Sequence, residues 1–186
     1  LTGPRDGYAF DISGTCVGVL ENRPAITGSE ISPGDVILAL ESNGIHANGM
    51  TLARKVLLGD TLDKQKNKVN EFSQTLGTTL GLELLKPTQI YVKEILEMMI
   101  AGIELKAVAH ITGGGFCNLN RVAANNIRHV LDNLPEPHPV FDLIQTSGNI
   151  SNAEMHGVFN MGIGMCVIVE GTNAAKQVQT IAEKHG

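Results

Sequence analysis

The sequence predicts an α+β domain built in layers around a mostly buried sheet. Short apolar runs rich in β-branched residues alternate with stretches whose apolar residues recur at helical spacing, and no long-period self-similarity indicates a repeat array. The length of 186 residues suits a single domain, residues 1–186, with a proper core. The 21 glycines cluster between these elements, which indicates backbone sites with special requirements.

The first third of the chain predicts two strands and a helix. Residues 15–20 and 35–40 are apolar and β-branched, so we expect buried strands. Residues 50–58 carry apolar positions at helical spacing, and Asn48 is placed to cap that helix. Residues 59–74 are polar, lysine-rich and without periodicity, so we expect an exposed connection that takes no part in chemistry.

The middle of the chain predicts a helix, a strand and a short helix. Pro87 suits the first turn of a helix that Gly102 ends. The apolar positions of this helix are Ile90, Val92, Ile95, Leu96, Met99 and Ile100. A buried strand is expected over residues 105–111, and a short helix over residues 118–124 follows a run of glycines.

The last third predicts two more helices around a strand. Pro139 begins a helix that ends near Gly148, and Ser151 with Glu154 forms a capping-box signature. A strand is expected over residues 163–169, and an amphipathic helix follows over residues 173–184.

Composition excludes several classes of protein. The net charge of −5 and the lack of a basic stripe with interleaved aromatic residues argue against nucleic acid as a partner. No apolar run approaches the roughly 20 residues that span a bilayer, and the first residues lack the pattern of a signal peptide, so we expect no membrane association. Cys16, Cys117 and Cys166 form an odd set without a CxxC pair, which indicates free thiols and a cytoplasmic protein.

A polar loop over residues 42–49 is the first candidate for chemistry. It lies between a predicted strand and a predicted helix start, where free backbone N–H groups favour anions, so it can cradle a phosphate or a ribose. The alternative is a helix-capping turn in which asparagine and glycine serve conformation alone. His46 within it is either a direct participant or a structural hydrogen-bonding residue.

Two further glycine-containing segments are candidates for the same cleft. Gly113, Gly114 and Gly115 follow Thr112, and three glycines in succession favour close approach of backbone to a ligand over a simple tight turn. The segment matches neither a P-loop nor a dinucleotide fingerprint. Residues 160–165 place an amide and two glycines before a strand, and either line that cleft or form a bulge.

Hydrolase and zinc-enzyme motifs are absent from the sequence. It contains no HExxH, no Cys/His ligand spacing and no Gly-x-Ser-x-Gly elbow, so we expect no metal site within the chain. The methionines within apolar stretches are interpreted as core, namely Met98, Met99, Met155, Met161 and Met165. The residues alone therefore predict an α+β domain that binds an anionic ligand.

Four ordered segments resemble the aminoimidazole ribonucleotide synthetase family. Residues 34–55 resemble its Ser-Gly-x-His-Ser-Asn-Gly-x-Ser-Leu-x-Arg motif, and residues 85–93 its Pro-Thr-Arg-Ile-Tyr-Val-Lys segment. Residues 109–115 resemble its His-Ile-Thr-Gly-Gly-Gly signature, and residues 159–165 its Phe-Asn-Met-Gly-Ile-Gly-Met. The resemblance covers nearly the whole chain, but only the C-terminal domain of that enzyme.

The resemblance implies a three-layer α/β/α domain with a mixed sheet and partial ferredoxin-like topology. It also implies a longer homodimeric enzyme whose N-terminal domain, absent here, forms the dimer interface and holds most contacts to ATP and Mg²⁺. The family's last strand would follow Gly186. We therefore expect the 186-residue chain to be inactive by itself.

The activity implied is conversion of formylglycinamidine ribonucleotide and ATP to aminoimidazole ribonucleotide, ADP and phosphate. The formyl amide oxygen is phosphorylated before the amidine nitrogen closes the ring. The candidate catalytic residues are His46 and His110. By resemblance, the ligand-binding residues are Ser42, Asn43, Gly44, His46, Asn48, Gly49 and Arg54 on one side, with His110, Thr112, Gly113, Gly114 and Gly115 opposite. Asn160 is a further candidate for ligand binding.

Some residues depart from the family pattern. Gln89 stands at a usual arginine, Asn120 at a usual proline, Ala47 at a usual serine and Met50 at a usual aromatic residue. Two other interpretations therefore stay open. One is a sister enzyme of the superfamily that includes selenophosphate synthetase and thiamine monophosphate kinase, and the other is a non-catalytic ligand-binding module.

Overall fold

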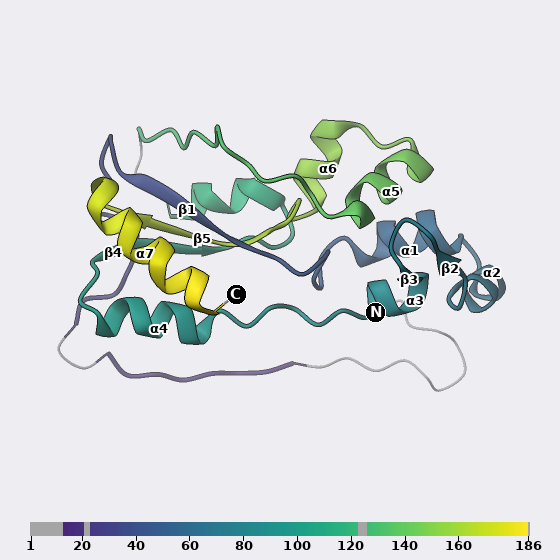
Figure 1. Ribbon diagram of the computed structural model, residues 1–186, viewed down its shortest axis with the longest axis horizontal. Helices are drawn as coiled ribbons and strands as arrows, with labels where there is room; N and C mark the ends of the chain where they lie inside the picture. The colour runs from purple at the N-terminus through teal and green to yellow at the C-terminus, as the bar shows by residue number, and fades with distance from the viewer. Residues whose placement is uncertain (1–12, 21–22, 123–125, 186) are drawn as a thin grey trace.

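The sheet of the protein has three strands, β1 (Val36–Glu41), β4 (Leu105–His110) and β5 (Ile163–Val169). The computed structural model describes residues 13–20, 23–122 and 126–185, and Figure 1 shows the strands and helices among them. β5 lies between β1 and β4 and runs antiparallel to both. β1 and β4 run in the same direction, but β5 separates them. The α+β class is confirmed, and the described sheet is antiparallel rather than mixed.

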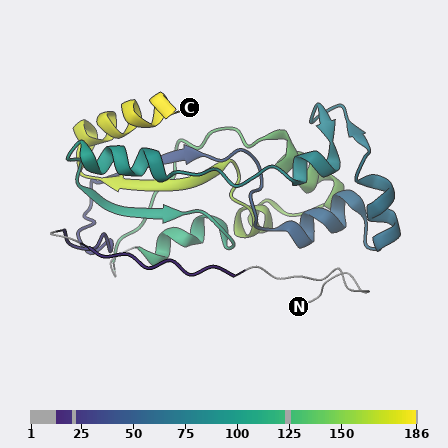
Figure 2. The ribbon, with the colours of Figure 1, turned by 90° about the horizontal axis from the view of Figure 1, so that it is seen from below.

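Helices cover both faces of this sheet. Figure 2 shows α4 (Val92–Ile100) and α7 (Gly171–His185) over one face and the 3₁₀ helix η1 (Gly115–Arg121) over the other. Alternate residues of β5 point to opposite faces, so each face has its own core. One core contains Leu40, Met98, Val167 and Val178, and the other contains Ala109, Leu119, Cys166 and Ile168.

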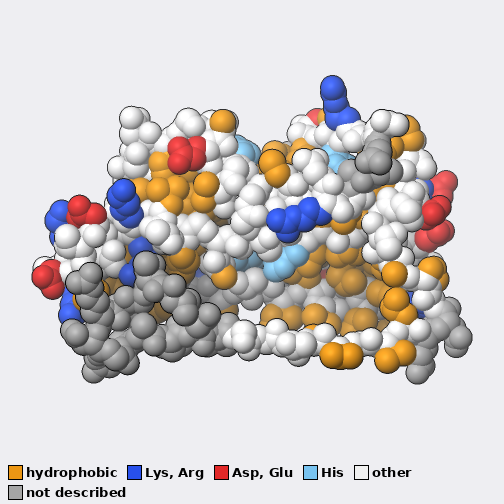
Figure 3. All heavy atoms as spheres, turned by 180° about the vertical axis from the view of Figure 1, so that it is seen from behind, with side chains coloured by type: hydrophobic (Ala, Val, Ile, Leu, Met, Phe, Trp, Pro, Cys, Tyr) orange, Lys and Arg blue, Asp and Glu red, His pale blue; other side chains and the backbone are white. Residues whose placement is uncertain are grey.

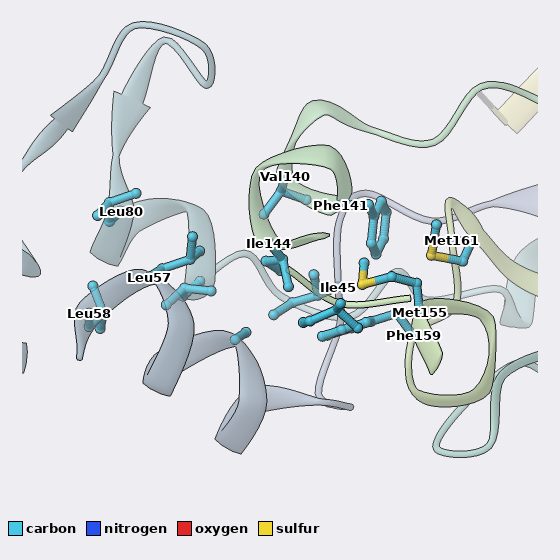
Figure 4. Packing of buried hydrophobic residues seen from close by; sticks show 13 residues of the cluster. Ile45, Leu57, Leu58, Leu80, Val140, Phe141, Ile144, Met155, Phe159 and Met161 are labelled. Carbon is cyan, nitrogen blue, oxygen red and sulfur yellow. The ribbon is translucent and has the colours of Figure 1, made fainter. Parts of the chain in front are cut away.

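The remaining helices form a second part of the molecule, which we call the helical lobe. It contains α1 (Met50–Leu58), α2 (Leu62–Lys68), α3 (Leu80–Leu84), α5 (Pro139–Gly148), α6 (Asn152–Val158) and the hairpin of β2 (Phe72–Ser73) with β3 (Thr78–Thr79). Figure 4 shows its core, in which Phe141 meets Phe159 edge to face with ring centroids 6.1 Å apart. Ile45 of the loop before α1 is buried in the same cluster, so this core fixes that loop.

Most predicted elements are confirmed. They are the strands expected at residues 35–40, 105–111 and 163–169 and the helices expected at residues 50–58, 139–148 and 173–184. Ser151 Oγ accepts a hydrogen bond from the N–H of Glu154 at 3.2 Å, as the capping signature predicts. The interpretation of the methionines as core is confirmed most clearly by Met98 and Met155, which are fully buried. Cys16, Cys117 and Cys166 are free, as expected.

Residues 15–20 form no strand, so that expectation is wrong. They run along the outside of the molecule (Figure 2), and Val17 and Val19 are 88% and 84% exposed. A strand needs a neighbour that exchanges hydrogen bonds with it, and within the described residues these have none. On β4, Lys106 O instead accepts from the N–H of Gly28 at 3.1 Å.

The helix expected to begin at Pro87 begins at Val92 instead. The N–H of Gln89 donates to the His46 imidazole, and Tyr91 Oη donates to the last carbonyl of β1 at 2.7 Å. These contacts keep the chain out of the helix until it has crossed the end of the sheet. The helix ends as expected, before Gly102, but four of its expected apolar positions are exposed, namely Ile90, Val92, Leu96 and Ile100.

Two other expectations need correction. Residues 59–74 are exposed, but they contain α2 and β2, because Thr61 Oγ1 caps α2 by accepting from the N–H of Lys64. The short helix expected at residues 118–124 is the 3₁₀ helix η1, which begins at Gly115, and residues 123–125 lie outside the described residues.

No helix among the described residues is long and apolar enough to cross a membrane.

A buried ion pair joins the beginnings of β1 and β4. Lys106 Nζ lies 2.8 Å from Asp35 Oδ1, and the two side chains are 9% and 6% exposed. Loss of one partner leaves the other charge buried, so we expect Lys106→Met to lower the urea midpoint of unfolding clearly. Lys64→Met, the control, removes a pair with Asp60 whose side chains are 62% and 61% exposed. Equal midpoints for the two variants would contradict the prediction.

Candidate functional site

The loop over residues 42–49 is fixed to the beginning of β5 by one fully buried side chain, Asn160. Asn160 Nδ2 donates to Gly44 O at 2.9 Å, and Asn160 Oδ1 accepts from the N–H of Gly162 at 2.9 Å and from Ser42 Oγ at 3.0 Å. The N–H of Ser42 also donates to Gly162 O at 2.8 Å. One amide thus satisfies groups on two chain segments and holds the loop in one shape.

His46 lies inside this loop with a left-handed backbone, φ 56°, and is 3% exposed. Its Nε2 accepts from the N–H groups of Asn43 and Gln89 at 3.4 and 3.3 Å. The neutral ring therefore carries its proton on Nδ1, which has no partner among the described residues. Burial lowers the pKa of His46, and the nearby charges of His110 and His138 lower it further. A neutral imidazole with one free N–H donor results.

Three rings meet beside the beginning of β5. The centroids of His46 and His110 are 6.5 Å apart, and that of Tyr91 lies 6.4 and 6.1 Å from them. A Cβ on Gly164 would lie 1.8 Å from Tyr91 Oη and 2.8 Å from His46 Cε1, so only glycine leaves room for both rings. The β1–β5 register shifts at Gly164, which confirms the bulge considered for this segment.

The glycine loop has its own internal support from Asn118. The N–H and Oγ1 of Thr112 donate to Asn118 Oδ1 at 2.9 and 2.7 Å, and Asn118 Nδ2 donates to Gly113 O at 3.1 Å. Gly115 has φ 54°, and a Cβ there would lie 1.9 Å from His156 O. Gly115 is therefore required by close packing of the backbone.

The glycine loop and the loop over residues 42–49 lie side by side. A Cβ on Gly113 would lie 3.4 Å from Asn48 Oδ1. Asn48 does not cap α1, contrary to expectation, because the capping position falls on Gly49, which has φ 71° and makes no side-chain bond. The first N–H groups of α1 thus have no side-chain cap, and such groups attract anions.

The structure gathers most of the predicted site residues but gives Arg54 another partner. His46 is buried, whereas His110, whose ring centroid lies 6.5 Å away, is exposed. Figure 3 shows histidine side chains near the middle of the molecule's back face. Arg54 donates to Gln65 Oε1 of α2 at 2.6 Å.

Sequence reasoning missed three residues that shape the site. They are Tyr91, Asn118 and His138, whose Nε2 donates to Ser42 O at 2.6 Å. Tyr91 stood in a family-like segment, and Asn118 follows the glycines closely enough that its role in the turn could have been considered. His138 had no signal, because it is distant in sequence from every loop of the site.

The site combines a buried neutral imidazole, an exposed histidine, a polar loop and an uncapped helix start beside glycines. Such a set can hold an anionic small molecule and donate hydrogen bonds to it. No group of three or more His, Cys, Asp or Glu side chains in the described part of the chain could hold a metal ion. The fold and site therefore define an α+β domain with two adjacent polar and glycine-rich loops at one end of its sheet.

The chain belongs to the family described as "AIR synthase related protein, C-terminal domain", which matches residues 32–186. It is 43% identical to the phosphoribosylformylglycinamidine cyclo-ligase of Methanopyrus kandleri over 185 residues, covering 98% of this chain and 50% of that protein. For the protein of the same name from Methanocaldococcus jannaschii the identity is 46% over 177 residues, covering 95% and 49%. The chain spans about half the length of these relatives.

Proposed function

We propose that the chain is the C-terminal domain of a phosphoribosylformylglycinamidine cyclo-ligase. The complete enzyme converts formylglycinamidine ribonucleotide and ATP to aminoimidazole ribonucleotide, ADP and phosphate in purine biosynthesis. The observation that carries the proposal is that two family-like loops lie side by side, since a Cβ on Gly113 would lie 3.4 Å from Asn48 Oδ1. Four ordered family segments and the cyclo-ligase relatives support it.

The residues of the cleft divide into two roles. The backbone of Gly49 and of the glycine loop, with Thr112, holds the phosphate of the ribonucleotide at the start of α1, where N–H groups and the helix dipole favour negative charge. The exposed His110 donates to the reacting part of the substrate, and the buried His46 Nδ1–H joins it when the ligand or a shift of the neighbouring rings uncovers it. Asn43 and Asn48 supply further polar contacts.

Asn160 holds the loop over residues 42–49 in position through hydrogen bonds to Ser42 and Gly44. The Asn160 amide is occupied by protein partners, so its contribution to binding is to fix the backbone that meets the ligand. Arg54 reaches a ligand only when it releases Gln65 of α2. A neutral His46 suits hydrogen-bond donation, because burial keeps its pKa low.

ATP supplies the phosphoryl group that activates the formyl oxygen. Most contacts to ATP and Mg²⁺ come from an N-terminal domain of the longer protein, as the family resemblance implies. That domain also forms a homodimer in the cytoplasm, where the free thiols stay reduced. The sheet of β1, β5 and β4 belongs to a three-layer α/β/α domain with partial ferredoxin-like topology. The 186 residues form this single domain of the longer protein.

The test is an assay of the longer protein with formylglycinamidine ribonucleotide and ATP, in which aminoimidazole ribonucleotide and ADP are measured. His46→Asn keeps a residue type that tolerates φ 56° but removes the imidazole, and we expect turnover to fall about 10- to 100-fold. His156→Ala, at a histidine of α6 whose Nδ1 bonds Asn152 O, is the control and keeps activity. A folded longer protein that forms no product would refute the proposed function.

A further inference from the structure

A second cavity, of about 480 Å³, lies between the end of β1, the beginning of α4 and the end of α7. It borders the beginning of the loop over residues 42–49, because Ser42 and Asn43 line it, but none of Thr112, Gly113, Gly114 and Gly115 does. Its polar lining includes Glu41, Asn43, Tyr91, Glu94 and His138. We call it the Glu94 cavity.

Two of the residues that line the Glu94 cavity each have a buried acceptor atom without a partner. Glu94 is 6% exposed, and its Oε2 makes no hydrogen bond within the described structure. Asn43 Oδ1 is likewise buried and unpartnered. A buried acceptor left without a donor costs about 1–3 kcal/mol, and a charged one costs more. Two such atoms on residues that line one cavity indicate a missing donor.

The donors that line this cavity are already used by the protein. Tyr91 Oη donates to Glu41 O at 2.7 Å, and His138 Nε2 donates to Ser42 O at 2.6 Å. Burial raises the pKa of Tyr91, and the negative charge of Glu94 raises it further, so the phenol keeps its proton. Protein hydroxyls and imidazoles therefore do not satisfy Glu94.

The negative charge of the residues that line the Glu94 cavity favours a positively charged ligand. Glu41, Glu94 and Glu183 line the cavity, and no Lys or Arg is among its described lining residues. An anion would meet carboxylates there, whereas a cation with N–H donors would meet both a charge and the two open acceptors. No group of three ligating side chains for a metal ion occurs in the described residues, which favours an organic cation.

We propose that the Glu94 cavity binds a cationic nitrogen group, an amidinium, guanidinium or ammonium, through Glu94 Oε2 and Asn43 Oδ1. The group belongs either to a free small molecule or to an Arg or Lys side chain elsewhere in the longer protein. This inference does not rest on the proposed function, since it concerns binding alone.

The experiment titrates the longer protein with methylguanidinium and measures binding by calorimetry and by the shift of the unfolding temperature. If the cation is a free molecule, methylguanidinium binds, Glu94→Gln weakens binding at least about 10-fold, and Glu154→Gln on α6 leaves it unchanged. Inorganic phosphate, the probe of opposite charge, does not compete. Turnover of the cyclo-ligase reaction is measured separately, so failure of either proposal is distinguishable.

If the cation is a side chain of the longer protein, methylguanidinium does not bind to the native form. Glu94→Gln then lowers its unfolding midpoint clearly more than Glu154→Gln does, and substitution of the Arg or Lys partner couples to Glu94 in a double-mutant cycle. A protein that neither binds methylguanidinium nor is destabilised by Glu94→Gln beyond the control would overturn the inference.

Discussion

We expect Asn160→Ala to lower the free energy of unfolding by about 2–5 kcal/mol, the largest stability loss from any polar side chain of the site. The amide satisfies Gly44 O, the N–H of Gly162 and Ser42 Oγ at a position with no exposure to solvent. Removal leaves the N–H of Gly162 buried without its acceptor and releases the loop from β5. Urea denaturation followed by circular dichroism measures the loss.

Asn152→Ala is the matched control for this prediction. Asn152 is the first residue of α6 and is exposed, and its recorded hydrogen bond uses the backbone carbonyl rather than the side chain. We expect a change within about 0.5 kcal/mol for an exposed substitution of this kind. Asn160→Ala with the same unfolding midpoint as the native protein would show that Asn160 does not hold the loop.

The second large effect is expected for Gly164→Ala. The added Cβ would lie 1.8 Å from Tyr91 Oη, and Tyr91 is 5% exposed and held by its bond to Glu41 O, so the ring has little space to move. Overpacking of this kind costs about 1–3 kcal/mol. Because His46 Cε1 lies 2.8 Å from the same Cβ, both rings must shift, and activity of the longer protein falls with stability.

Tyrosine fluorescence gives a local measurement of this change. Tyr8 and Tyr91 are the two tyrosines of these 186 residues, which contain no tryptophan, so in the 186-residue chain Tyr8→Phe leaves Tyr91 as the reporter. We expect Gly164→Ala to alter its emission and its quenching by acrylamide. Gly157→Ala on α6, where a Cβ meets nothing within 4 Å, serves as control. Unchanged Tyr91 emission and stability in Gly164→Ala would contradict the packing argument.

Local patterns predicted the elements whose structure depends on neighbours close in sequence. The helix over residues 139–148 was predictable because proline fits a first helical turn, and the structure has α5 at Pro139–Gly148. The strand over residues 163–169 was predictable because its residues are almost all apolar and it is buried on both faces. The family segments likewise placed both loops of the candidate site before any geometry was known.

Other features depended on contacts between distant segments. Residues 15–20 have a strand-like sequence but no described strand beside them. High β propensity alone does not form a strand, because a strand needs a neighbour that exchanges backbone hydrogen bonds with it. The chain after Pro87 stays out of a helix because His46 and the end of β1 accept its hydrogen bonds. Pro87 and His46 are forty-one positions apart, so the sequence pattern near Pro87 cannot predict that hydrogen bonds to His46 and β1 replace a helix there.

The sequence by itself determined the family, the α+β class and the two loops of the candidate site, because these follow from short motifs and local periodicity. The tertiary structure decided which polar side chains are hydrogen-bonded within the protein and which have an atom without a hydrogen-bond partner. Asn160 and Asn118 are used by the protein, whereas His46 Nδ1 and Glu94 Oε2 have no partner among the described residues. The physical reason is that hydrogen-bond satisfaction is a property of the folded arrangement, set by atoms that only folding brings together.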